Sequence, residues 1–254
     1  MIAGASLVRM TMIPEQKPGV SGLGKVLKNS APHTQVPNFS AIKNAQTKKT
    51  AFFDFLKPMV KHQNAIIEGE RTFLIGVKSQ IEQHTALTDA DEFRLQHIAE
   101  KYQYASKRIN TNTLTKLLTR VDTIPEQMVL IQAANETGWG SSRFAREGFN
   151  FFGQWCFRKG CGLVPRSRSH GLYHEVATFK SVDDSVAAYM RNLNSNAAYS
   201  LFRSIRADMR AKNEVPTAQK LVYGLVNYSE RQEAYIDDLL RMLRQNQPYL
   251  ADNK

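Results

Sequence analysis

The sequence predicts a mainly α-helical protein that carries one small β insertion. Apolar residues recur at helical intervals between Ala51 and Ile81, and again in several later segments. Residues that favour helix starts, such as Thr88 and Ser181, stand directly before such segments. The stretch 151–180 differs, because it is rich in aromatic and β-branched residues and holds four glycines. Such a composition is typical of short strands joined by tight turns.

Three parts are expected along the chain. Residues 1–48 are rich in Gly, Pro, Ser, Asn and Lys without sustained periodicity, and we expect a flexible or meandering basic arm. Residues 49–110 form a helical N-terminal region, and residues 111–254 form a second helical part that contains the β lobe at about 151–180. The helices are expected at 51–81 (with Gly69 and Gly76 as breaks or bends), 89–104, 112–120, 125–137, 143–147, 182–192, 198–212, 216–227 and 230–246.

Length and hydropathy limit the class of protein. With 254 residues, of which 42% are hydrophobic, the chain can bury one sizeable core or two small ones. No run approaches the ~20 apolar residues that a membrane-spanning helix needs, so we expect no transmembrane segment. Residues 1–10 are too short and too interrupted for a secretory signal, and none is visible in the sequence.

The chain is strongly basic, with a formal net charge of +11. Residues 1–50 hold seven Lys and Arg against Glu15 alone, and contribute +6 of this charge. A basic arm favours polyanions such as nucleic acid, anionic lipid or acidic cell-wall polymers, or else it is a solvated tail without a partner. Aromatic residues do not alternate with these charges as they do in single-strand binding surfaces. We therefore expect no nucleic-acid partner, but a general attraction to anionic polymers.

The two cysteines, Cys156 and Cys161, lie within the predicted lobe and are separated by four residues that include Gly160. This spacing fits a local disulfide that closes a hairpin, and with it an oxidising compartment. A reduced pair of buried thiols is the alternative. The pair lacks nearby Cys or His partners for a zinc site, and we expect neither a metal nor a cofactor.

Glu136 is the residue most indicative of chemistry. It lies near the end of an apolar helical segment that begins at Pro125 and stops at Gly138. Trp139 and Phe144 follow closely, and an apolar wall raises the pKa of a carboxyl group because it penalises the charged form. A carboxylic acid that is still protonated near neutral pH is what a glycosidase uses to protonate the leaving group.

The sequence also resembles a known family. The motif at 134–142, Ala-Asn-Glu-Thr-Gly-Trp-Gly-Ser-Ser, followed by Asn-Phe-Phe-Gly at 150–153, resembles the signature of bacterial β-N-acetylglucosaminidases. This group includes flagellar peptidoglycan hydrolases and proteins like mannosyl-glycoprotein endo-β-N-acetylglucosaminidase. Together with Cys-Phe-Arg-Lys-Gly-Cys-Gly at 156–162 and His-Glu-Val-Ala at 174–177, the pattern is most similar to the Bax proteins of Gram-negative bacteria. The resemblance covers about 115–246 and leaves out the basic arm.

The resemblance implies a lysozyme-like helical fold with a small β lobe, and cleavage of β-1,4-linked N-acetylglucosaminyl bonds in peptidoglycan or a related glycan. It implies that Glu136 is the catalytic glutamate, and that the family's catalytic tyrosine corresponds to Tyr228 in Asn-Tyr-Ser-Glu at 227–230. A glycan substrate and the two cysteines together suggest a periplasmic or cell-envelope location.

A second carboxylate is the open point of this prediction, because retaining and inverting glycosidases generally use two. Glu175, in the predicted lobe, is the first candidate. Asp183 and Asp184 come next, although their position suits the first turn of a helix. In the alternative mechanism the N-acetyl group of the substrate is the nucleophile, and Tyr228 stabilises or positions charge.

Aromatic residues near Glu136 are the candidates for sugar binding. Each of them is either a stacking platform or part of the core, and we expect one ring of the Phe151–Phe152 pair to face inward and the other to face the cleft. The predicted substrate-binding residues are Trp139, Asn150, Phe151, Phe152, Gly153 and Trp155.

The sequence thus predicts an endo-β-N-acetylglucosaminidase. Two alternatives remain: a lytic transglycosylase, which uses one glutamate in a similar fold, and a glycan-binding module that has lost turnover.

Overall fold

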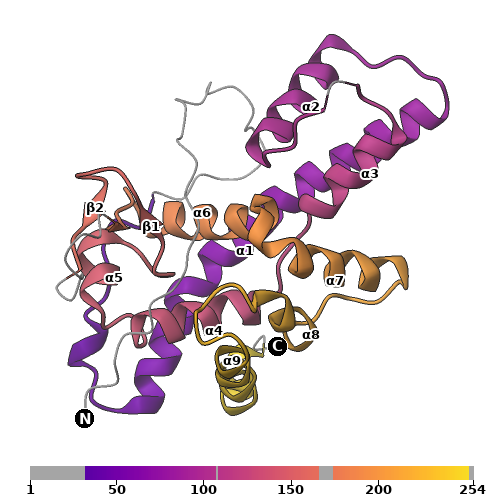
Figure 1. Ribbon diagram of the computed structural model, residues 1–254. Helices are drawn as coiled ribbons and strands as arrows, with labels where there is room; N and C mark the ends of the chain where they lie inside the picture. Colours follow the sequence, from indigo (N-terminus) through magenta and orange to yellow (C-terminus); the bar gives the residue numbers. More distant parts are fainter. Residues whose placement is uncertain (1–31, 107, 166–173, 252–254) are drawn as a thin grey trace.

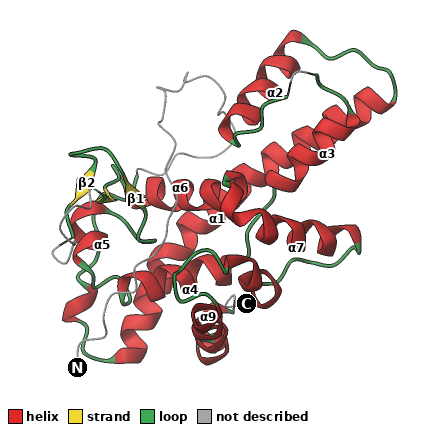
Figure 2. Ribbon diagram, viewed as in Figure 1, coloured by secondary structure: helices red, strands yellow, loops and turns green. Residues whose placement is uncertain are grey.

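A computed structural model describes residues 32–106, 108–165 and 174–251. Figures 1 and 2 show a mainly helical molecule in which the strands form a small lobe next to α5. Within the described residues, no helix is long and apolar enough to span a membrane. The α-helices are α1 Ala45–Glu82, α2 Asp89–Lys101, α3 Thr111–Arg120, α4 Glu126–Thr137, α5 Arg143–Gly148, α6 Val182–Ser195, α7 Ser200–Ala211, α8 Ala218–Leu221, α9 Glu233–Gln245 and α10 Gln247–Leu250.

The long helix α1 organises the fold. It contacts α3, α4 and α6, while α2 and α3 lie towards its C-terminal end and the β lobe lies towards the other (Figure 1). Its buried side includes Phe52, Leu56 and Leu74, which join one continuous core with the other helices. The prediction of breaks at Gly69 and Gly76 is wrong. Both positions face open space, so helical packing elsewhere along α1 outweighs the cost of the two glycines.

Local capping explains where several helices begin. Thr88 and Asp91 form a capping box at α2, and Ser181 accepts a hydrogen bond from the backbone N–H of Asp184 at α6. The predicted helix 89–104 ends earlier, at Lys101. The predicted helix 216–227 is shorter than expected, because α8 passes at Val222 into the 3-10 helix η3, Val222–Leu225.

The β lobe is a three-stranded antiparallel sheet rather than a simple hairpin. Strand β3, Glu175–Ala177, lies between β1, Trp155–Cys156, and β2, Gly162–Leu163. Trp155 pairs with Val176 in one ladder, and Gly162 pairs with Ala177 in the other. The sheet therefore has β3 as its central strand and β1 and β2 as its edges, and the chain leaves β3 towards α6.

Part of the predicted arm belongs to the folded core. Residues 1–31 lie outside the described residues, but the segment 32–48 contains the 3-10 helix η1, Phe39–Ala41, and the start of α1. Phe39 is fully buried, and its ring lies so close to Gly140 that a Cβ there would overlap it. The expectation of a loose arm is thus wrong for 32–48, because one aromatic side chain anchors this segment behind the glycine-rich motif.

Candidate active site

The chain bends sharply just after Glu136. Gly138 caps α4 in the left-handed conformation, and its N–H donates to the carbonyl of Ala134. Trp139 and Gly140 also have positive φ angles, of 60° and 72°. Glu136 therefore stands in the last turn of α4, and the residue is partly exposed. This is the helix end that the sequence predicts.

A chain of buried hydrogen bonds leads to one oxygen of Glu136. The Tyr235 hydroxyl donates to Glu136 Oε1 at 3.0 Å, and Gln132 Nε2 donates to the same hydroxyl at 3.0 Å. The hydroxyl of Tyr189 donates in turn to Gln132 Oε1. Because each amide and hydroxyl in this chain has a partner, the orientation of Glu136 is tied to α4, α6 and α9.

The ionisation of Glu136 follows from these surroundings. Burial raises the pKa of its carboxyl to about 7, while hydrogen bonds from Tyr235 and Asn135 lower the pKa and only partly offset this rise. Burial and the charge of Glu136 raise the pKa of Tyr235 well above its ordinary value, so this hydroxyl remains a donor. A substantial fraction of Glu136 is therefore protonated at neutral pH and can act as an acid.

The turn at 149–153 approaches the other oxygen of Glu136. Gly153 has a φ of 63°, and a Cβ added there would lie 3.3 Å from Glu136 Oε2. Asn150 builds this turn. Its side-chain amide donates to the carbonyls of Gln154 and Ala177, and its Oδ1 accepts from the backbone N–H groups of Phe152 and Gln154. Gly153 thus lines the site, whereas the buried polar groups of Asn150 support the turn.

The predicted split of Phe151 and Phe152 is wrong, because both rings are fully buried. Phe151 lies against Phe52 and Phe55 of α1, and Phe152 stacks on Tyr189 with ring centroids 3.9 Å apart. Burial against helices that are distant in sequence therefore makes both residues core rather than sugar platforms.

Tyr228 lies near the site but uses its hydroxyl elsewhere. The hydroxyl donates to the carbonyl of Phe152 at 2.8 Å, and the side chain is fully buried. Its ring stacks on the ring of Tyr235, with the two centroids 5.4 Å apart. Burial is the main cause that raises the pKa of Tyr228, and the charge of Glu136 is the second. The tyrosine that contacts Glu136 is Tyr235, which was not among the residues predicted from the sequence. The spacing of Tyr235, Leu239 and Leu243 at intervals of four residues indicates only that Tyr235 lies on the buried face of α9, and it does not point to Glu136.

The two tryptophans come from different segments, Trp139 from the turn after α4 and Trp155 from β1, and both are partly exposed. Trp139 meets Phe52 and Phe53 edge-on, and Lys49 Nζ lies 5.1 Å from its ring centroid. Trp155 stacks on the buried ring of His174 at 4.0 Å. Each tryptophan ring thus packs against other side chains of the protein, and sugar binding by the remaining part of the ring stays a prediction.

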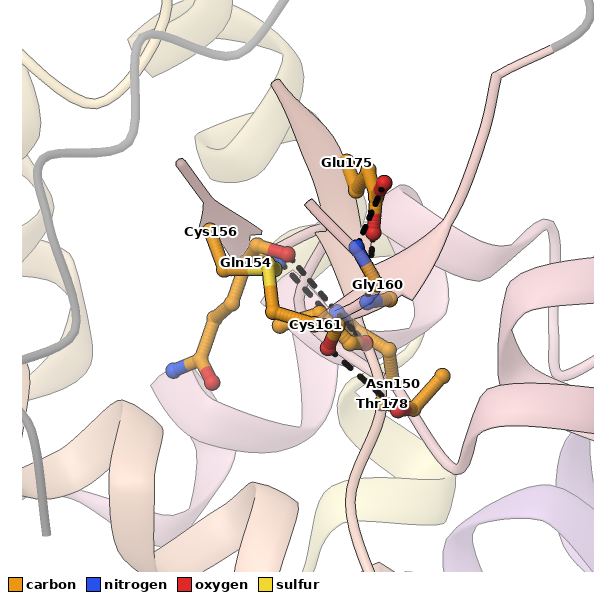
Figure 3. Close-up of a disulfide and its surroundings, with 9 residues drawn as sticks. Asn150, Gln154, Cys156, Gly160, Cys161, Glu175 and Thr178 are labelled. Atoms are coloured by element: carbon orange, nitrogen blue, oxygen red, sulfur yellow. Dashed lines mark hydrogen bonds between the residues drawn. A yellow bond between two sulfur atoms is a disulfide. The ribbon is translucent and has the colours of Figure 1, made fainter. Parts of the chain in front are cut away.

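Cys156 and Cys161 form the predicted disulfide, with Cα atoms 6.2 Å apart. Figure 3 shows the carboxylate of Glu175 facing Gly160 beside this bond. Glu175 is buried, and its two oxygens accept the backbone N–H groups of Gly160 and Gly162 at 3.0 and 2.8 Å. Its carboxylate therefore holds the turn of the lobe, which does not support its predicted role as second catalytic carboxylate. Because the sulfurs are joined and the oxygens have backbone donors, this cluster does not suit a metal ion.

Asp183 and Asp184 lie in the first turn of α6, where the helix dipole favours acids. Asp183 Oδ2 accepts the backbone N–H of His33 at 2.7 Å and lies 3.0 Å from its Nδ1, while Asp184 is exposed. The positions of Glu175, Asp183 and Asp184 are thus explained by structural roles, and none of the three supports the prediction of a second catalytic carboxylate.

A groove also lies between α2 and α3, where residues such as Leu95 and Leu114 line it. None of the residues around Glu136 belongs to this groove.

Comparison with known proteins agrees with this geometry. The protein-family model described as mannosyl-glycoprotein endo-β-N-acetylglucosaminidase matches residues 111–248, which include α4, the β lobe and α9. Protein bax of Escherichia coli (strain K12) is 35% identical over 236 residues, which cover 91% of this chain and 82% of that protein. No solved structure matches the chain significantly. The chain therefore belongs to the glucosaminidase family.

Proposed function

We propose that the protein is an endo-β-N-acetylglucosaminidase that hydrolyses β-1,4 bonds in peptidoglycan or a related glycan containing N-acetylglucosamine. Glu136 is the general acid. The observation that carries the proposal is a glutamate that is partly exposed as a residue, whose carboxyl has a pKa raised to about 7 by burial and an orientation set by Tyr235. Its family supports the same substrate class. The disulfide and a wall-derived substrate support a periplasmic or cell-envelope location.

In this mechanism the protonated Glu136 gives its proton to the glycosidic oxygen as the bond to the anomeric carbon breaks. The candidate second carboxylates are engaged by Gly160, Gly162 and His33 or lie exposed on α6. We therefore favour substrate assistance, in which the N-acetyl carbonyl oxygen attacks the anomeric carbon. Glu136, now ionised, then takes a proton from the water that opens this intermediate, and the original configuration is retained.

Product analysis tests the function. Digestion of purified peptidoglycan is expected to release fragments with reducing N-acetylglucosamine ends and retained configuration at the new anomeric carbon, measured by mass spectrometry and NMR. Anhydro-muramoyl ends would instead identify a lytic transglycosylase. Tight binding to the glycan without cleavage at any pH would identify a binding module. Inversion of configuration would exclude the substrate-assisted route and require a second carboxylate.

The pH profile is expected to show the Glu136 carboxyl directly. Because the acid must be protonated, kcat should be constant below about pH 7 and fall about tenfold per pH unit above it. Tyr235→Phe removes a hydrogen bond that favours the ionised form, so the pKa of Glu136 rises and the decline moves to higher pH. Steady-state rates between pH 4 and pH 10 measure the shift, with Tyr223→Phe at an exposed tyrosine as the control. A decline that moves to lower pH in Tyr235→Phe would contradict the assignment.

A further inference from the structure

The bend that follows Glu136 needs support from its surroundings. Trp139 and Gly140 both have positive φ angles, and for Trp139, which carries a side chain, this conformation is unfavourable. Such a backbone persists only where other contacts fix it. One contact is local, because the hydroxyl of Thr137 accepts the N–H of Gly140 at 2.8 Å and donates to the carbonyl of Ala133 at 2.6 Å.

The second support comes from the N-terminal segment. Phe39 of η1 is fully buried, and its ring lies so close to Gly140 that a Cβ there would overlap it. The same ring meets the rings of Phe52 and Phe55 in α1 edge-on, at centroid distances of 5.5 and 5.8 Å. Phe52 in turn meets the ring of Trp139 edge-on at 5.8 Å. Phe39 therefore contacts the bend directly at Gly140 and, through Phe52, indirectly at Trp139.

The segment that carries Phe39 is itself fastened to the rest of the fold. The backbone N–H of His33 donates to Asp183 Oδ2 at 2.7 Å, and the carbonyl of His33 accepts the N–H of Val182 at 3.0 Å. These bonds join the segment to the start of α6, while the ring of Phe39 joins it to α1. Phe39 lies outside residues 111–248, which the family model matches. The bend after the candidate acid thus depends on a part of the chain outside that range.

We propose that Phe39 is a positioning residue for catalysis, which acts through Gly140 to hold the bend that places Glu136. This inference rests on the proposed function, since it takes Glu136 as the general acid. Glu136 stands in the last turn of α4, directly before the bend. A bend that relaxes therefore moves the carboxyl group relative to the hydroxyl of Tyr235 and to Gly153. A displacement of about 1 Å is enough to lower a reaction rate about 100-fold.

The first test is the rate and pH profile of Phe39→Ala. The variant is expected to lower kcat on peptidoglycan by about 10- to 100-fold. The decline in rate should also move to lower pH, because a relaxed bend admits water to Glu136 and burial is what raises the pKa of its carboxyl. The nearby tyrosines do not obscure this shift, because burial raises their pKa values and keeps them neutral; they are Tyr189, Tyr199, Tyr228 and Tyr235.

Leu74→Ala is the matched control for a loss of core packing. Leu74 is also fully buried in α1, but it lies 22 residues beyond Phe52, about 33 Å further along the helix axis. Its variant should be destabilised, yet it should keep the wild-type kcat and pH profile at a temperature where both variants are folded. Phe39→Leu keeps part of the apolar volume and should lose less activity than Phe39→Ala, and it replaces Phe39→Ala if that variant does not fold.

A double-mutant cycle tests the contact itself. Gly140→Ala places a methyl group against the ring of Phe39 and also strains the backbone at its φ of 72°. Phe39→Ala removes the overlap and leaves the strain unchanged. The variant with both changes should therefore lose less kcat than the product of the two separate losses.

Losses that simply multiply in the double variant would overturn the proposal. So would a decline in rate that keeps its pH in Phe39→Ala, or one that moves equally in Leu74→Ala. If the wild-type protein cleaves no glycan, the proposed activity fails. Titration of the Glu136 carboxyl by NMR, with ¹³C-labelled glutamate and Glu136→Gln to assign the signal, then still tests the role of Phe39. A carboxyl pKa that is lower in Phe39→Ala than in Leu74→Ala supports positioning, and equal values overturn it.

Discussion

Glu136→Gln is expected to lower kcat on peptidoglycan by about 10² to 10⁴-fold, the range that a positioned general acid supplies. Glutamine keeps the shape of the side chain, and its oxygen can still accept the hydrogen bond from Tyr235. It has no acidic proton for the leaving oxygen. The effect should therefore fall on kcat, while binding of the glycan changes little, because the lost interaction is one made in the transition state.

The same variant should be at least as stable as the wild type. A neutral amide carries no penalty for burying charge, whereas burial of the Glu136 carboxyl disfavours its ionised form. Glu147→Gln, on the surface of neighbouring α5, is the matched control, since it changes an exposed glutamate that forms only a long ion pair, at 3.8 Å, with Arg143. Release of reducing ends and urea unfolding measure the two quantities. Wild-type turnover in Glu136→Gln would remove this residue from the mechanism.

Local signals in the sequence were sufficient to find the helix that carries the acid. Gly138 marks the end of α4, and Thr88 and Ser181 mark the starts of α2 and α6, because capping depends on residues within one turn. The position of Glu136 at a helix end follows from the same short-range rules. The disulfide could also be predicted, because two cysteines five positions apart with a glycine between them readily form a bond that closes a tight turn.

Contacts between segments that are distant in the sequence could not be predicted from such local signals. The burial of Phe151 depends on Phe52 and Phe55, about a hundred residues earlier in the chain. The choice between Tyr228 and Tyr235 depends on the route of the chain between η3 and α9. Their rings stack face to face, yet only one hydroxyl reaches Glu136 while the other reaches the carbonyl of Phe152. No local pattern distinguishes two such tyrosines.

The second large effect is expected at Arg206 of α7, whose side chain is fully buried and contacts the end of α3 and α6. Its guanidinium donates to backbone carbonyls, including those of Thr119, Arg120 and Asp122, and to Asn194 Oδ1 at 2.8 Å. Its Nε lies 3.7 Å from the carboxylate of Asp122, which is also buried. Burial lowers the pKa of Arg206 to about 10, so the group is still charged at neutral pH.

Arg206→Met is therefore expected to lower the free energy of unfolding by about 3–5 kcal/mol, the usual cost of removing one partner from a buried charge pair. Methionine also leaves several buried or partly buried carbonyls at the end of α3 without the donor that Arg206 supplies. Arg210→Met is the control, because Arg210 contacts the same carboxylate at 2.9 Å from a partly exposed position and should cost less. Urea unfolding followed by circular dichroism measures both variants.

Activity separates this structural effect from a catalytic one. Arg206 lies beside the start of α4, and ten residues of helix place Glu136 about 15 Å further along its axis. At low temperature, where the variant is still folded, Arg206→Met should keep the kcat and the pH profile of the wild type. Equal destabilisation by Arg206→Met and Arg210→Met would contradict the assigned role, because it would show that burial adds nothing to the contribution of this arginine.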